Sequence, residues 1–148
     1  MNPLKIYLAG RCKGLSDGGK EWRDNARKIL ETIADTADTK VVVFDPTEHF
    51  GYAEQKHKTQ KQIKDYYYHA MRQCDIVLLN CSGTEFSIGT AQEVQYAVDH
   101  DIPVIGFGED HVYPWITEVD CQVVFSSIHE ALDYIRDYYL MGGDIWIK

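Results

Sequence analysis

The residues with the most evident chemical potential lie where an apolar run gives way to a helical pattern. The run Ile76–Leu79 leads into a polar loop over residues 80–86, and a helical pattern begins within residues 87–93. A glycine-containing loop between a strand and a helix leaves backbone N–H groups facing outward, and the helix dipole adds positive potential there. The segment therefore predicts an anion-binding junction that carries one carboxylate, Glu93.

Two interpretations of Glu93 follow from its position. The run Thr90-Ala91-Gln92-Glu93 fits a capping box, in which a threonine hydroxyl bonds the N3 amide and the glutamate reaches back to the cap residue. A carboxylate near the positive end of a helix is also expected to stay ionised at neutral pH, and it can then act as a nucleophile. The sequence alone leaves both roles open.

Two further side chains are expected near Glu93. Tyr7 lies near the end of the first apolar run, where a phenol could donate a hydrogen bond to the carboxylate and orient it. Ser87, together with the amides of Gly89 and Thr90, could hold an anion, although an ordinary turn serine fits the same position.

Short apolar strands alternate with amphipathic helices along the chain. Strands are predicted over residues 4–10, 41–44, 76–79, 102–107 and 122–125, and helices over residues 21–33, 60–72, 90–100 and 128–140. This alternation predicts a single flavodoxin-like or Rossmann-like α/β domain over residues 1–148, with a five-stranded parallel sheet covered by helices on both faces. In such a sheet the ligand crevice lies between strands one and three, where the loop with Gly10 and Arg11 should meet the junction that ends at Glu93.

Two segments suggest functions beyond the sheet. The connection over residues 45–59 is long for an α/β unit, which favours a functional loop over a pocket, although a surface excursion fits as well. The end of the chain, residues 142–148, carries Trp146 and Ile147, whose burial needs a partner surface. We therefore expect a homo-oligomer, a dimer or higher.

The composition excludes several classes of partner. The formal charge of −8 argues against a nucleic-acid polymer, whose phosphates require clustered lysine and arginine. The four cysteines form no C-x-x-C pair and the six histidines lack metal-ligand spacing, so we expect reduced thiols, no metal and no other cofactor. No signal-peptide pattern or membrane-spanning apolar run is present, which predicts a cytoplasmic protein without a membrane partner.

Four segments together carry a family resemblance: Tyr-Leu-Ala-Gly at residues 7–10, Cys-Asp-Ile-Val at 74–77, Gly-Thr-Ala-Gln-Glu-Val-Gln-Tyr-Ala at 89–97 and Ile-Pro-Val-Ile at 102–105. In order and spacing they resemble the nucleoside 2-deoxyribosyltransferase family over most of the chain. The resemblance implies that Glu93 attacks C1′ of a deoxynucleoside, that Tyr7 orients it, and that bases are exchanged through a covalent deoxyribosyl intermediate. It also implies an aspartate as the general acid ahead of the third strand, where the nearest counterpart is Asp65, in an offset register.

Two positions depart from the transferase pattern. Ser87 stands where the transferases commonly have an aspartate, and it resembles the serine that helps to hold the phosphate in the related 2′-deoxynucleoside 5′-monophosphate N-hydrolases. Arg11 replaces a frequent proline and could pair with the same phosphate, assisted by Lys13. The small-molecule substrate could thus be a nucleoside or its 5′-monophosphate, and the acceptor a second base or water.

Two other functions remain open at this point. A phosphoribohydrolase-type nucleotide hydrolase would share the fold, but the chain lacks the Pro-Gly-Gly of that loop. A non-catalytic nucleotide-binding or sensor protein would keep the crevice and lose the chemistry. The absence of the aspartate at Ser87 and the uncertain position of the acid are compatible with the second function.

Overall fold

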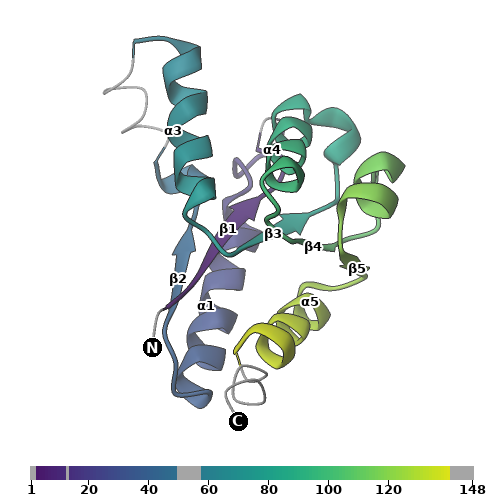
Figure 1. Cartoon of the computed structure of the whole chain (residues 1–148). Helices are drawn as coiled ribbons and strands as arrows, with labels where there is room; N and C mark the ends of the chain where they lie inside the picture. Colours follow the sequence, from purple (N-terminus) through teal and green to yellow (C-terminus); the bar gives the residue numbers. More distant parts are fainter. Residues whose placement is uncertain (1–2, 13, 50–57, 141–148) are drawn as a thin grey trace.

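The computed structural model describes residues 3–12, 14–49 and 58–140, and a five-stranded parallel sheet of order β2-β1-β3-β4-β5 lies at its centre (Figure 1). The order is that of flavodoxin-like folds, so the predicted fold class is confirmed. The strands are short and apolar, as expected where helices cover both faces. They are β1 Leu4–Ala9, β2 Val41–Phe44, β3 Ile76–Asn80, β4 Val104–Phe107 and β5 Val123–Phe125.

The helices follow the predicted pattern, with shifts at some of their ends. Helix α3 matches its predicted range, whereas α4 begins two residues before the predicted start at Thr90. The last predicted helix is α-helical only to Ile135 and continues as a π-helical turn, η4. The helices are α1 Lys20–Thr36, α3 Gln60–Arg72, α4 Ile88–Asp99 and α5 Ile128–Ile135, with the short turns η1 Pro46–Glu48, η2 Thr84–Phe86, η3 Trp115–Asp120 and η4 Arg136–Leu140.

Alternation along β1 decides which side chains reach which layer. Ile6 and Leu8 point to the core formed with α1 and α5, whereas Tyr7 and Ala9 point to the opposite core, which includes residues of α3 and α4. Figure 1 shows α1 and α5 on one side of the sheet and α3 and α4 on the other. Tyr7 is thereby directed to the face where Glu93 of α4 lies, since successive side chains of a strand alternate between faces.

Some expectations concern residues outside the described ranges. They are the assisting role of Lys13, most of the long connection, residues 50–57, and the tail with Trp146 and Ile147. Within the described ranges, no helix combines the length and the apolar character that crossing a bilayer requires.

Candidate active site

A cavity of about 710 Å³ opens between the loop after β1, the beginning of α4 and one face of α3. The two glycine-marked loops predicted to meet between strands one and three do meet here. A smaller cavity of about 310 Å³ adjoins it, and Tyr7, Arg23 and Glu93 are among its lining residues. The larger cavity is lined by Gly10, Arg11, Cys12, Gly18, Gln60, Ile63, Tyr67, Phe86, Ser87, Ile88, Gly89, Thr90 and Glu93.

The Tyr7 hydroxyl donates a short hydrogen bond to Oε2 of Glu93. Tyr7 has no exposed surface, and its ring stacks on Phe44 with 5.3 Å between centroids, so the phenol is fixed in place. Burial, followed by the neighbouring Glu93, raises the pKa of Tyr7 well above its usual value, which keeps the proton on the phenol as the donor. The predicted orienting contact between Tyr7 and Glu93 is therefore present.

Burial also governs the charge of Glu93. It raises the pKa of this carboxyl from its usual 4.5 to about 7, while the hydrogen bond from Tyr7 and the positive charge of Arg23 oppose the increase. The expectation that the helix dipole keeps Glu93 firmly ionised at neutral pH is therefore wrong. Burial raises the pKa more than Tyr7 and Arg23 lower it, so both forms of Glu93 are populated near neutral pH.

The capping-box interpretation of Glu93 is also wrong. Ser87 is the N-cap of α4: its Oγ accepts a hydrogen bond from the Thr90 amide at 3.3 Å and lies 2.7 Å from the Thr90 hydroxyl. The Ser87 amide donates to the Thr84 carbonyl, and the Glu93 side chain bonds Tyr7 instead of the cap. Because the helix begins at Ile88, Glu93 lies beyond the first turn and faces the cavity.

The other predicted binding residues lie around the same opening. The Arg11 guanidinium lies over the Phe86 ring, 5.2 Å from its centroid, at the cavity wall. Gly89 is exposed, and a Cβ built on it would meet open space. A Cβ on Gly10 would approach Trp22 Cζ2 to 2.9 Å, so the close approach of the loop to α1 requires glycine there. The structure therefore brings Gly10, Arg11 and Gly89 together with Ser87, Thr90 and Glu93.

Asp65 does not lie in this site. Its carboxylate is exposed, 2.7 Å from Nζ of Lys61, and it lines neither cavity. The reason is helical geometry: the face of α3 toward the cavity carries Gln60, Ile63 and Tyr67, spaced three and four residues apart, and Asp65 falls on another face. Among the described residues that line the two cavities, Glu93 is the only carboxylate.

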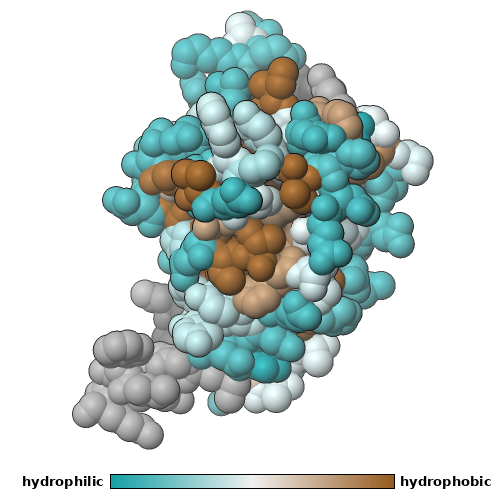
Figure 2. All heavy atoms as spheres, turned by 90° about the vertical axis from the view of Figure 1, so that its right-hand side faces the viewer, coloured by the Kyte–Doolittle hydropathy of each residue, from teal (hydrophilic) through white to brown (hydrophobic). Residues whose placement is uncertain are grey.

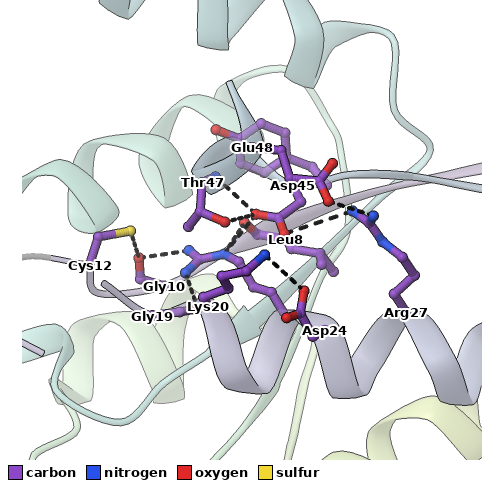
Figure 3. A network of polar contacts seen from close by, with 12 residues as sticks. Leu8, Gly10, Cys12, Gly19, Lys20, Asp24, Arg27, Asp45, Thr47 and Glu48 are labelled. Carbon is purple, nitrogen blue, oxygen red and sulfur yellow. Dashed lines mark hydrogen bonds and ion pairs between the residues drawn. The ribbon is translucent and has the colours of Figure 1, made fainter. Parts of the chain in front are cut away.

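Sequence reasoning missed a buried cation beneath the site. Arg23 is 1% exposed, and its guanidinium donates to the carbonyls of Leu8 (3.4 Å), Gly19 (2.8 Å) and Gly10 (3.0 Å). Its Nε also lies 3.7 Å from Oδ1 of the fully buried Asp45. Figure 3 shows this network, which joins the end of β1, the beginning of α1 and the segment after β2. The amphipathic pattern of α1 gave no signal for it, because arginine on a helix normally indicates a solvent-exposed face.

Comparison with known proteins identifies the family of the chain. Residues 6–125 match the family model described as nucleoside 2-deoxyribosyltransferase. A search of curated proteins finds no match.

Solved structures share the fold. The 2-desoxiribosyltransferase from Leishmania mexicana is similar to this chain with a TM-score of 0.70 and 21% identity, over 93% of this chain and 100% of that one. The 2-deoxyribosyltransferase from Bacillus psychrosaccharolyticus is similar with a TM-score of 0.60 and 18% identity, over 88% and 91% of the two chains. Because the family model spans most of the sequence, the chain belongs to the nucleoside 2-deoxyribosyltransferase family of N-glycosidic-bond enzymes.

Proposed function

We propose that this enzyme cleaves the N-glycosidic bond of a 2′-deoxynucleoside 5′-monophosphate, with Glu93 as the nucleophile and water or a second base as the acceptor. The observation that carries the proposal is the Glu93 carboxylate, which Tyr7 holds at the wall of a cavity without any other carboxylate among its described lining residues. Membership of the family and the likeness to the two deoxyribosyltransferases support the same chemistry.

The reaction proceeds in two displacements. The C1′–N bond breaks, its electron pair leaves with the base, and an oxygen of Glu93 bonds C1′ as positive charge develops on the sugar. Water or another base then attacks C1′ and releases Glu93. Tyr7 restricts the carboxylate to one orientation, which lowers the entropic cost of attack. The leaving base takes its proton from water that enters the open cavity, since Asp65 is remote.

The opening of the cavity suits a phosphate. Arg11 supplies a guanidinium, which binds phosphate oxygens in pairs, and the first turn of α4 directs the amides of Ile88 and Gly89 outward. Ser87 caps the same turn and adds a hydroxyl instead of the negative charge that an aspartate would bring. These groups favour a nucleotide over a nucleoside.

Replacement of Glu93 by glutamine removes the nucleophile and keeps the shape of the side chain. For E93Q we expect kcat to fall by about 10⁴-fold or more, because the neutral amide cannot attack C1′. Chromatography of the base released from deoxynucleoside monophosphates, with and without an acceptor base, measures the loss and separates hydrolysis from transfer.

A matched control removes a carboxylate outside the cavity. We expect D65N to stay within about twofold of wild-type activity, because the exposed Asp65 pairs with Lys61 and lines neither cavity. Undiminished base release by E93Q would refute Glu93 as nucleophile. A large loss in D65N would restore Asp65 as the acid.

The raised pKa of Glu93 should also make the free energy of unfolding depend on pH. Because the pKa of Glu93 is about 7 in the folded protein and near 4.5 unfolded, the folded state binds the proton more tightly. Its contribution to stability is complete below about pH 4.5 and is lost as the pH rises through about 7. E93Q should therefore gain stability over wild type at pH 8, on the order of 2 kcal/mol, and the gain should shrink toward pH 5. Urea unfolding at both pH values measures it; a gain independent of pH would contradict the burial of an ionised Glu93.

The phosphate assignment predicts a change of substrate preference at Ser87. S87D keeps a good helix N-cap but places a negative charge beside the phosphate, so kcat/KM for the monophosphate should fall at least about tenfold relative to the nucleoside. S87N is the matched control, since asparagine has the size and capping ability of aspartate without its charge. Equal preference in S87D and S87N would show that no phosphate binds at this turn.

We also propose that the protein is a homo-oligomer of two or more copies. Large apolar side chains are exposed around η2, the beginning of α4 and η3, and Figure 2, which faces this side of the molecule, shows hydrophobic groups among hydrophilic ones. Phe86, Ile88, Trp115 and Val119 are each more than half exposed in the single chain. Light scattering coupled to size exclusion should give a mass of at least two chains. A monomer at assay concentration would contradict the assembly.

A further inference from the structure

The charge of Arg23 is only partly compensated, by one acid that it shares with Arg27. Its three hydrogen bonds go to the carbonyls of Leu8, Gly19 and Gly10, which are neutral acceptors. Asp45, the acid recorded within ion-pair distance of it, lies 3.7 Å away, and Asp45 is shared with Arg27 at the same distance. A guanidinium at 1% exposure therefore acts on its surroundings with little screening by water.

The carbonyls that Arg23 binds belong to the wall of the reaction site. Leu8 and Gly10 flank the end of β1, directly after Tyr7, and Gly10 lines both cavities. Arg23 itself lines the smaller cavity together with Tyr7 and Glu93. Arg23 therefore bonds the end of β1, the strand that carries Tyr7. Its positive charge lies beside the smaller cavity, which Glu93 also lines.

We propose that Arg23 is a positioning residue for the reaction at Glu93: it fixes the Leu8–Gly10 end of β1 and favours the ionised carboxylate, while Asp45 limits that effect. The proposal rests on the proposed role of Glu93 as nucleophile. It extends that function to a residue of α1, on the other face of the sheet, which acts through the end of β1 and the charge of Glu93.

Other groups contribute to the field at Glu93, and they come from every element around it. Tyr7 donates from β1, Arg11 and Lys64 bring further positive charges from the loop after β1 and from α3, and Asp45 lies beyond Arg23. The titratable and charged groups are Tyr7, Arg11, Cys12, Arg23, Asp45, Lys64, Tyr67 and Tyr68. The buried pair of Arg23 and Asp45 differs from the rest in that its two members should move the pKa of Glu93 in opposite directions.

The experiment measures the pKa of the Glu93 carboxyl directly and does not need activity. In glutamate-labelled full-length protein, the ¹³C signal of the carboxyl is followed from about pH 4 to about pH 10, and E93Q identifies it by its disappearance. We expect R23M to raise the pKa of Glu93 by about one unit, which below the midpoint lowers kcat/KM about tenfold. D45N should lower the pKa of Glu93, since it leaves the charge of Arg23 less compensated.

Two variants separate charge from position. R23K keeps the charge but not the planar fork that binds the carbonyls, so the pKa of Glu93 should stay near its wild-type value while kcat falls about tenfold. R27M is the matched control on the same helix: Arg27 also faces Asp45 but is 31% exposed and lines neither cavity, so pKa and kcat should both stay near wild type.

The outcomes are distinct from those of the proposed function. An unchanged pKa of Glu93 in R23M, or shifts of the same sign in R23M and D45N, would overturn the role of Arg23. If R23M does not fold, R23K and D45N decide: a shift in R23K, or no decrease in D45N, overturns it. Full activity of E93Q would instead remove the nucleophile and leave the electrostatic shifts as they are measured.

Discussion

The hydrogen bond from Tyr7 to Glu93 is the contact on which the site depends, because it joins β1 to α4, the helix that borders the cavity. It requires that β1 directs Tyr7 to the α4 side, which the alternation of Ile6, Tyr7 and Leu8 provides. It also requires that α4 begins at Ile88, which the Ser87 cap sets. The parallel order places β1 beside β3, so the loop that follows each strand reaches the same edge.

The contact with Tyr7 places the Glu93 carboxyl in partly buried surroundings, which disfavour its charged form. Burial raises the pKa of Glu93 to about 7, although a phenol and a buried guanidinium both favour the anion. A group that titrates near neutral pH can serve as a nucleophile and can also be released again as a good leaving group. In its proposed role, the buried Arg23 favours the ionised form of Glu93, and Asp45 beside it limits that effect.

The fold was largely predictable from the sequence, because each strand is a short apolar run and each helix carries a regular amphipathic pattern. The position of Tyr7 beside Glu93 also followed, since the switch point of a parallel sheet lies between its first and third strands. The start of α4 did not: Ser87 and Thr90 are both good caps, and only the hydrogen bonds decide between them.

Other features depend on contacts that no local pattern encodes. The resemblance implies an aspartate ahead of the third strand, with Asp65 as its nearest counterpart, but helical geometry turns Asp65 outward and brings Tyr67 to the cavity. Arg23 and Asp45 are far apart in sequence, and each resembles an ordinary surface residue until the packing of α1 on the sheet buries both. The raised pKa of Glu93 likewise reflects surroundings contributed by several elements.

The covalent step at Glu93 is the central claim, and mass spectrometry of the acid-quenched enzyme tests it most directly. A deoxynucleoside monophosphate that carries fluorine at C2′ slows release of the intermediate, because fluorine destabilises positive charge at C1′. If Glu93 is the nucleophile, the peptide that contains it gains the mass of the sugar phosphate as an ester, and E93Q gains none. An enzyme that releases base from this substrate without an adduct, or with an adduct on another residue, would contradict it.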